Sequence, residues 1–440
     1  MKDTDTDRAS STALTVWLQR LENLHSREID LGLERVGQVA RRLQLPLQSS
    51  PERSRTITFA GTNGKGSTLA MTQAMALAAG LKVGSYTSPH FLYFNERIQI
   101  QGQPVTDAAI ITAFEKIEAA RAEISLSYFE FATLAALVIF NQADLDLWLL
   151  EVGLGGRLDA VNLVDADVAV VTTVALDHQE YLGDDLEGIG FEKAGIFRPG
   201  QAAVLGSRQL PASVHQQATA LGCSIYQLGR EFNQQDQQQT WCWQGSGYHG
   251  QALELPGLPW PQLPRDNAAT AVQALLLSGL PVSEEAIKQG LSQARVTGRM
   301  QRQGAWLLDV AHNPQAADYL SQQLAQEKPC RRLAIVGMMA DKDQAATLSP
   351  LLAQVDAWLV TALPTPRAEQ PEKLKTLLES KGGRVLDVFT QADGRQVFSR
   401  AQQLLGTGEF DQVVVLGSFF TVALFLDALQ ADARSSCVTV

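Results

Sequence analysis

The sequence predicts an α/β fold in two domains, each built around a mainly parallel sheet. Its 440 residues exceed what one hydrophobic core usually serves. Apolar runs of strand length alternate with segments of helical periodicity, which is the pattern of βα units. The alternation weakens at 206–265 and restarts near residue 300. We therefore place the domains at 1–297 and 298–440, with the junction near the segment 294–304.

The first domain begins with helices and then alternates strands with helices. Helical periodicity covers 14–25, after a polar tail, and the stretch 29–43 leads into a second helix. Strands are predicted at 56–60, 82–87, 145–153 and 167–175, and helices at 65–79, 131–142 and 267–279. The two later strands are continuous apolar runs, as expected for parallel strands buried on both faces.

Residues 206–265 are less regular and include the Gln-rich, Trp-containing stretch 233–244. We interpret this region as strands and loops, with a structural hairpin favoured over a binding motif.

In the second domain the alternation returns and predicts a smaller doubly wound, Rossmann-like unit. Strands are predicted at 305–313, 331–339, 357–364, 384–389 and 412–418, and helices at 314–327, 343–354, 369–380, 391–405 and 421–429.

Composition excludes several classes of protein. Apolar residues make up 45% and charged residues 19%, which indicates a globular chain. A net charge of −11 argues against a general nucleic-acid-binding protein. The longest apolar stretch near the end is broken by Gly417 and is too short to cross a bilayer. No signal peptide or CxxC pair is found, so we expect free thiols and a cytoplasmic location.

The most informative short stretch is TITFAGTNGKGST, residues 56–68. It resembles a P-loop, but Phe59 occupies the place of the first glycine and Gly66 intervenes between Lys65 and Ser67. A strand before it and a helix after it favour a phosphate cradle, because helix N-terminal N–H groups attract anions. Lys65 would then reach the β- and γ-phosphates, and Ser67 or Thr68 would face Mg²⁺. The alternative is an ordinary Gly-rich turn with an incidental lysine.

Further polar residues follow the ends of neighbouring strands, where ligands bind in parallel sheets. Glu151 ends one apolar strand and is either a magnesium ligand or a capping glutamate. Asp177 and His178 follow the next strand, and their position favours a site role. Lys193, from the residues alone, reads as a solvated helix lysine.

Three more positions are candidates on the same argument. Ser88, with His90 and Arg97 nearby, follows a strand and suits an anionic or metal-bound ligand. Asp309 lies at the end of a strand in the second domain, followed by His312 and Asn313, and Arg299 lies at the junction.

Several longer motifs occur in one order along the chain: GTNGKGST, SPHF…ER, LEVGLGGRLDAVN, LDH…LG…EKAGIF, NAATA, GR and DVAHNP. Together they resemble the Mur ligase superfamily, and closely the bacterial dihydrofolate synthase/folylpolyglutamate synthase family. The resemblance covers nearly the whole chain and is weakest at 206–265. It implies an N-terminal P-loop ATPase-type domain and a C-terminal domain of the glutamate ligase type.

The resemblance also implies an activity. Members of this family are ATP-dependent ligases in which a carboxylate attacks the γ-phosphate of ATP and forms an acyl phosphate. The amine of L-glutamate then displaces phosphate. The implied substrates are dihydropteroate, reduced folates and L-glutamate, and the implied cofactors are ATP and Mg²⁺ at two sites. A monomer is expected from the resemblance.

Site residues are carried over by motif. The resemblance assigns ATP to Thr62, Asn63, Gly64, Lys65, Gly66, Ser67, Asn267, Arg299 and Asp309. It assigns metal to Ser88, Glu151 and His178, catalysis to Lys65, Lys193 and His178, and a carbamate to Lys193. The pterin of dihydropteroate is assigned to Ile29, Asp30, Leu31, Ser127, Tyr128, Phe129, Glu130, Leu158, Asp159 and Ala160. Phe129 offers a stacking face, and Asp30 or Asp159 a hydrogen-bond acceptor.

Three other functions stay open at this point. A monofunctional folylpolyglutamate synthase is expected to lack the dihydropteroate-binding set. A peptidoglycan Mur ligase is expected to carry a separate N-terminal domain for its UDP-linked substrate, for which the sequence before residue 56 leaves no room. A nucleotide-dependent switch would bind or hydrolyse ATP regardless of pteroate and glutamate.

Overall fold

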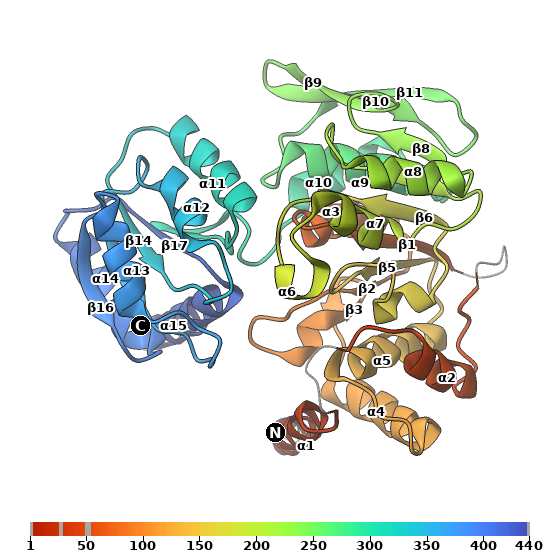
Figure 1. Cartoon of the computed structure of the whole chain (residues 1–440), viewed down its shortest axis with the longest axis horizontal. Coiled ribbons are helices and arrows are strands. Elements are labelled where there is room, and N and C mark those ends of the chain that lie inside the picture. Colours follow the sequence, from red (N-terminus) through yellow and green to blue (C-terminus); the bar gives the residue numbers. More distant parts are fainter. Residues whose placement is uncertain (1–2, 26–29, 49–53, 438–440) are drawn as a thin grey trace. The chain divides into compact units, whose positions relative to one another are not determined.

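The computed structural model describes residues 3–25, 30–48 and 54–437, with side chains described for 12–25, 30–48 and 54–429. The chain divides into two compact units, Met1–Ala294 and Arg295–Val440. Each unit contains one large sheet with helices packed against it (Figure 1).

The large sheet of the first unit has the strand order β4-β3-β2-β5-β1-β6-β7-β8. Its strands are β1 (Arg55–Ala60), β2 (Val83–Tyr86), β3 (Ile98–Ile100), β4 (Gln103–Pro104), β5 (Leu147–Glu151), β6 (Val168–Val171), β7 (Ala202–Leu205) and β8 (Ser224–Gln227). The run from β2 to β8 is parallel, and β3 and β4 are antiparallel. Strand β1 lies between β5 and β6, so the chain segments that follow these three strands leave one edge of the sheet together.

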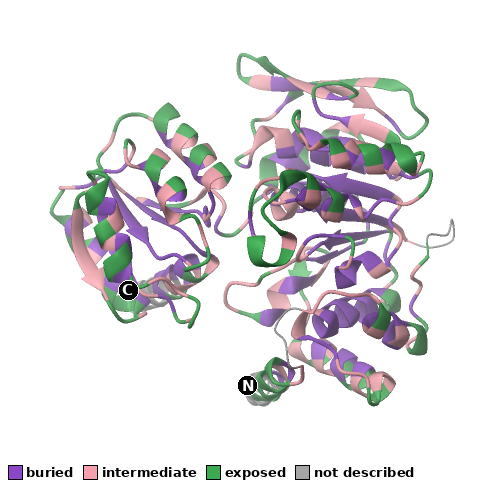
Figure 2. Ribbon diagram, viewed as in Figure 1, coloured by how far each residue is buried: buried purple, intermediate pink, exposed green. Residues whose placement is uncertain are grey.

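Two helical layers cover this sheet on opposite sides (Figure 1). One contains α3 (Lys65–Ala78), α9 (Arg265–Leu277) and α10 (Glu284–Gln293), which pack on one another. The other contains α1 (Asp3–Glu22), α2 (Glu34–Arg42), α4 (Asp107–Arg121) and α5 (Tyr128–Gln142). Central strands and inner helix faces are buried (Figure 2). Near the site lie α6 (Gln179–Leu182), α7 (Leu186–Ala194) and two short 3₁₀ helices, η1 (Phe94–Arg97) and η2 (Ala160–Leu163).

Two expectations about this unit were wrong. The first helix begins at Asp3, well before residue 14, although its first turns are rich in Asp, Thr and Ser, which are weak helix formers, and it ends at Glu22. The region 206–265 also contains a helix, α8 (Ala212–Ala220), besides the three-stranded sheet of β9 (Asn233–Gln237), β10 (Thr240–Ser246) and β11 (Ala252–Leu258). Its Gln-rich stretch does form a hairpin, in which Trp241 and Trp243 are fully buried.

The second unit has a six-stranded sheet in the order β12-β13-β17-β14-β15-β16, parallel except for the β12–β13 pair. Its strands are β12 (Gln301–Gln303), β13 (Trp306–Leu308), β14 (Arg332–Val336), β15 (Ala357–Thr361), β16 (Val385–Phe389) and β17 (Gln412–Leu416). Its helices are α11 (Pro314–Gln326), α12 (Gln344–Leu348), η3 (Ser349–Leu351), α13 (Pro371–Ser380), α14 (Gly394–Gly406) and α15 (Phe419–Cys437). The predicted α/β class is confirmed for both units.

A helix needs both length and hydrophobicity to cross a bilayer. No helix in the described part of the chain combines the length and hydrophobicity needed to span a membrane.

Packing between α5 and the first sheet yields a stability prediction. Phe140 is fully buried, packs on Trp148 at a ring separation of 5.7 Å and lies against Gly84 of β2. Phe140→Ala should lower the free energy of unfolding of the first unit by about 3–5 kcal/mol, because it leaves a cavity. Tyr93 is 61% exposed. Tyr93→Ala should therefore change the free energy by no more than about 0.5 kcal/mol. Urea unfolding followed by tryptophan fluorescence measures both, and equal losses would contradict the assigned packing.

Candidate active site

The Gly-rich loop after β1 adopts a conformation that side chains at two positions would prevent. Gly61 has φ of +147°, and a Cβ atom there would lie 1.9 Å from Thr172 Oγ1. Gly64 precedes the first residue of α3 with φ of +90°, in the left-handed region that favours glycine. The amide group of Asn267 on α9 lies against it, about 2.9 Å from the position of a Cβ.

The loop is fastened to the residues that follow β6. Thr62 N donates to Thr173 O at 2.7 Å, and Asn63 N donates to Thr173 Oγ1 at 3.0 Å. Thr172 Oγ1 donates to Asn63 O at 2.7 Å. These bonds fix the loop in one shape before any ligand arrives, which is the preorganisation that anion binding by backbone N–H groups requires.

The side chains at the start of α3 have different partners. Lys65 Nζ donates to Gly61 O at 3.0 Å and to Thr62 O at 3.4 Å, so the ammonium group lies over its own loop. Thr68 Oγ1 donates to Gly64 O at 2.8 Å. Within the described residues no hydrogen bond of the Ser67 hydroxyl is found, although Ser67 is only 5% exposed. Ser67 is therefore the better placed of the two hydroxyls for a phosphate-bound metal.

Glu151 ends β5 beside this loop. It is 5% exposed, and both of its carboxylate oxygens lie 3.6 Å from the position of a Cβ on Gly66. Ser88 N donates to Glu151 Oε2 at 3.3 Å, so the Ser88 segment reaches the same carboxylate. The Glu151 side chain faces the phosphate loop, which favours a role as a magnesium ligand over a role as a capping residue.

The loop 153–157 packs against α7 through main-chain atoms. A Cβ on Gly156 would lie 2.8 Å from Glu192 O and 3.0 Å from Lys193 O. Arg157 N donates to Glu192 O at 2.8 Å, and Asn162 Nδ2 donates to Gly195 O at 3.0 Å. This contact places Lys193 on the inner side of α7, where it is 4% exposed.

Lys193 is thus not the solvated lysine that the residues alone suggested. Burial and, to a smaller extent, the nearby positive charge of Lys65 lower its pKa to about 7. The negative charges of Asp177 and Asp159 oppose this shift. His178 lies close in sequence to this group, with φ of +51° and its N–H donating to Asp177 Oδ1 at 2.9 Å. Near neutral pH a large fraction of Lys193 is therefore an uncharged amine.

The metal ligands assigned from the sequence are a hydroxyl, a carboxylate and an imidazole. In the described part of the chain no group of three or more His, Cys, Asp or Glu side chains is placed to hold a metal ion. A metal here would depend on Ser88 and Glu151, on phosphate oxygens and on water, which is how Mg²⁺ is usually held at phosphate sites.

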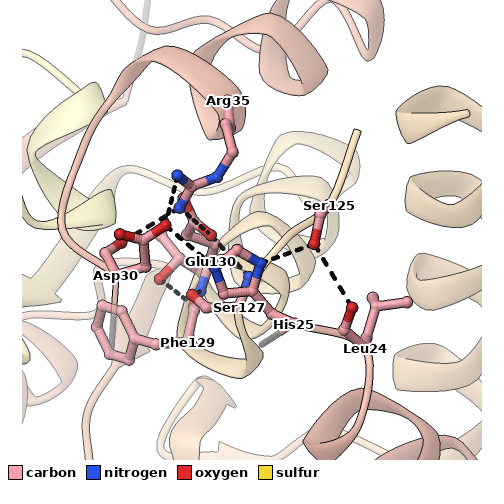
Figure 3. Close-up of polar contacts among 9 residues, drawn as sticks. Leu24, His25, Asp30, Arg35, Ser125, Ser127, Phe129 and Glu130 are labelled. Atoms are coloured by element: carbon pink, nitrogen blue, oxygen red, sulfur yellow. Dashed lines mark hydrogen bonds and ion pairs between the residues drawn. The ribbon is translucent and has the colours of Figure 1, made fainter. Parts of the chain in front are cut away.

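The three segments assigned to the pterin meet in the structure. Gly32 N donates to Leu158 O at 3.0 Å, which joins the segment of Asp30 and Leu31 to that of Asp159 and Ala160. Arg35 joins Asp30 to Glu130, and the Phe129 ring lies against Gly153 (Figure 3). Ile29, also assigned to this set, lies outside the described residues.

Several residues of this set already have partners within the protein. Asp159 accepts hydrogen bonds from the N–H groups of Gly153, Leu154 and Val161, and burial raises its pKa to about 6. Its carboxylate therefore holds the shape of its own loop. Ser127 and Glu130 form a capping box at the start of α5, and the Tyr128 ring packs under Arg97.

The second unit gathers its own candidates at the ends of β13 and β17. Asp309 is buried and accepts from Met300 N and Ala311 N, both at 2.8 Å. Burial raises its pKa, and the charge of Arg299 opposes this. The Arg299 guanidinium lies 5.4 Å from the Phe419 ring centre, and the His312 ring lies 6.2 Å from the same ring.

Sequence reasoning missed several residues of these sites. Thr172 and Thr173 fix the phosphate loop. Two hydroxyl residues at the end of an apolar strand were the sequence pattern that could have indicated them. His25 and Ser125 contact the Asp30 cluster, and Phe419 stacks with Arg299. For these three no local pattern exists, because their partners lie far away in sequence.

Comparison with known proteins places this geometry in a family. The Mur ligase middle domain matches residues 59–251, and the Mur ligase glutamate ligase domain matches residues 295–419. The dihydrofolate synthase/folylpolyglutamate synthase of Escherichia coli (strain K12) is 46% identical over 433 residues, which is 97% of each chain.

Solved structures of the same family resemble this chain over nearly its whole length. E. coli FolC in complex with DHPP and ADP superposes with a TM-score of 0.87 at 44% identity, covering 96% of this chain and 98% of that one. A bifunctional folylpolyglutamate synthase/dihydrofolate synthase with Mn, AMPPNP and L-glutamate bound gives a TM-score of 0.85 at 46% identity, covering 95% and 98%. The chain therefore belongs to the Mur ligase family, within its group of dihydrofolate synthase/folylpolyglutamate synthases.

Proposed function

We propose that the chain is an ATP-dependent ligase that adds L-glutamate to dihydropteroate, giving dihydrofolate, and to reduced folates, giving folylpolyglutamates. One observation carries the proposal. A phosphate loop, a buried carboxylate and a buried lysine converge in a chain that is 46% identical over its length to an enzyme with both activities. The solved relatives bind ADP, AMPPNP, DHPP and L-glutamate, which are the nucleotides and substrates that this reaction needs.

The chemistry follows from the poor reactivity of a carboxylate as an acyl donor. An acceptor carboxylate oxygen attacks the γ-phosphorus of ATP, the bond to the β-phosphate oxygen breaks, and ADP leaves. The resulting acyl phosphate carries a good leaving group. The amine of glutamate attacks the acyl carbon, loses a proton and expels inorganic phosphate. Phosphoryl transfer of this kind depends mostly on alignment and charge neutralisation.

The loop residues are the proposed binding site for the phosphates of ATP. Backbone N–H groups at the start of α3 hold phosphate oxygens, and Lys65 swings from its contacts with Gly61 and Thr62 to the β- and γ-phosphates. In the first unit the other proposed ATP contacts are Thr62, Asn63, Gly64, Gly66, Ser67 and Asn267. In the second unit they are Arg299 and Asp309.

Ser88, Glu151 and His178 are the proposed ligands of Mg²⁺, with Ser67 beside them. Oxygen donors and phosphates suit Mg²⁺, whereas an imidazole also suits Mn²⁺, the metal present in a solved relative. A divalent ion supplies positive charge that offsets the charge of the transferred phosphoryl group. The protein contributes a carboxylate fixed beside Gly66 and a loop that is shaped in advance.

Lys193 is the proposed site of a carbamate. Its pKa of about 7 leaves a neutral amine whose Nζ can add CO₂ and release a proton, so that the residue becomes an anion. The change of sign removes the repulsion between Lys193 and Lys65.

Two of the alternatives make distinct predictions. A monofunctional folylpolyglutamate synthase would use tetrahydrofolate alone, and the gathering of the three pterin segments supports the bifunctional reading. A nucleotide switch would hydrolyse or bind ATP without regard to acceptor or glutamate.

The decisive test measures phosphate release with ATP, Mg²⁺ and L-glutamate, with dihydropteroate or tetrahydrofolate as acceptor. We expect release that requires glutamate and either acceptor, with glutamylated products detected by mass spectrometry. Release with tetrahydrofolate alone would leave the monofunctional enzyme. Release that ignores acceptors and glutamate would leave the switch.

A lysine substitution tests the phosphate loop. Lys65→Met should lower kcat at least about 100-fold with both acceptors, because charge stabilisation of the transferred phosphoryl group is lost. Lys82 is an exposed lysine paired with Asp144, and Lys82→Met serves as the matched control, with activity near that of the unaltered chain. Similar activity in both variants would remove Lys65 from the catalytic machinery.

The pKa of Lys193 makes stability depend on pH. Above about pH 7 the folded chain holds Lys193 neutral, while the unfolded chain stays protonated up to its ordinary value of 10.5. The unfolded state then binds more protons, so this group makes stability rise with pH from about 7 to 10.5. Lys193→Met lacks this contribution and should be more stable than the unaltered chain at pH 7, by a margin that shrinks toward pH 9. Urea unfolding without bicarbonate measures the margin, and a margin independent of pH contradicts the assigned burial.

A further inference from the structure

A chain of polar side chains crosses the first unit beside the proposed pterin site (Figure 3). It runs from Ser125 to His25, then to Asp30, Arg35 and Glu130. These residues come from the end of α1, from the segment around the start of α2, and from the start of α5. The chain therefore joins three elements that are up to 100 residues apart in sequence.

The contacts in this chain are within hydrogen-bond distance. Ser125 Oγ lies 2.7 Å from His25 Nδ1, and His25 Nε2 lies 3.0 Å from Asp30 Oδ2. The ring can donate from Nε2 to the Asp30 carboxylate, while Ser125 Oγ lies within hydrogen-bond distance of both His25 Nδ1 and Leu24 O. The His25 side chain is 11% exposed, so water competes little for these bonds.

Arg35 completes the connection. Its NH1 lies 2.6 Å from Asp30 Oδ2, and its NH2 lies 3.1 Å from Glu130 Oε1, whose side chain is 3% exposed. Arg35 NH2 also donates to Asp30 O at 3.3 Å. One guanidinium thus holds both the side chain and the main chain of Asp30 against the first turn of α5, where Ser127 and Phe129 lie (Figure 3).

We propose that Ser125, His25 and Arg35 are positioning residues that set the affinity of the chain for dihydropteroate by holding Asp30 against the start of α5. This inference rests on the function proposed above. It assigns a role to three residues that are outside the set carried over by the resemblance. Asp30 alone would sample several rotamers, and ordering it only on binding would cost affinity.

The effect falls on one acceptor more than on the other for a chemical reason. Dihydropteroate ends in a single aromatic carboxylate, so its pterin ring must supply most of the recognition. In tetrahydrofolate that carboxyl group is an amide to glutamate, whose two carboxylates offer additional contacts. A loosened Asp30 should therefore weaken dihydropteroate more than tetrahydrofolate.

The experiment uses the full chain and the variants Ser125→Ala, His25→Ala, His25→Gln and the double variant Ser125→Ala/His25→Ala. The matched control is Arg20→Ala, which breaks the exposed contact of α1 with Glu118 on α4 and leaves the Asp30 cluster untouched. For each variant, KM and kcat are measured with dihydropteroate and with tetrahydrofolate, together with KM for ATP and the thermal midpoint.

We expect His25→Ala to raise KM for dihydropteroate about tenfold, as the loss of a hydrogen bond to a charged group predicts. KM for tetrahydrofolate should rise less than about threefold, with kcat and KM for ATP within about twofold, since the phosphate loop is untouched. Gln at position 25 keeps an N–H donor and should restore part of the affinity. The double variant should match His25→Ala, because Ser125 reaches Asp30 through the His25 ring.

Three results would overturn the inference: equal rises of KM for both acceptors, no rise in either histidine variant, or additive effects in the double variant. Ser125→Ala removes only one oxygen, so it keeps the test valid if His25→Ala fails to fold. Failure of the unaltered chain to use dihydropteroate would refute the proposed function itself. Turnover of dihydropteroate with unchanged KM in the variants would refute this inference alone.

Discussion

The parallel pairing of β1 with β5 and β6 is the constraint on which the first unit depends. Its register sets Phe59 beside Glu151 and Ala60 beside Val171, so the chain leaves the three strands at one level. The phosphate loop, the Glu151 carboxylate and the threonines after β6 meet there without any long side chain bridging a gap. A shift of β5 by one residue in its ladder with β1 would turn Glu151 to the other face of the sheet.

The sequence was informative where a local pattern has one physical cause. Apolar runs revealed the strands, and a Gly-rich motif between a strand and a helix marked the phosphate loop. Residues such as Glu151 and Asp309 were found because strand ends in parallel sheets form sites. The start of α1 was missed because its polar residues carry no apolar periodicity. Helix α8 was missed because it lies in a region with a weak pattern.

Other features depend on contacts between distant segments, which a single sequence does not contain. The role of His25 depends on its contacts with Ser125 and Asp30, and that of Arg35 depends on its ion pair with Glu130. The burial of Lys193 likewise depends on the loop 153–157 covering α7, so the residues alone suggested an exposed helix lysine. Its environment costs stability at neutral pH, which proteins accept mainly where a perturbed group has a task.

The contact between the loop 153–157 and α7 has a consequence for how this site tolerates sequence change. Gly156 leaves room there for the carbonyl groups of Glu192 and Lys193, Arg157 N donates to Glu192 O, and the Arg157 side chain pairs with that of Glu192. Any side chain in place of Gly156 would push the two segments apart and displace Lys193. The same arrangement leaves little freedom for insertions, because one added residue in either segment would break the main-chain match.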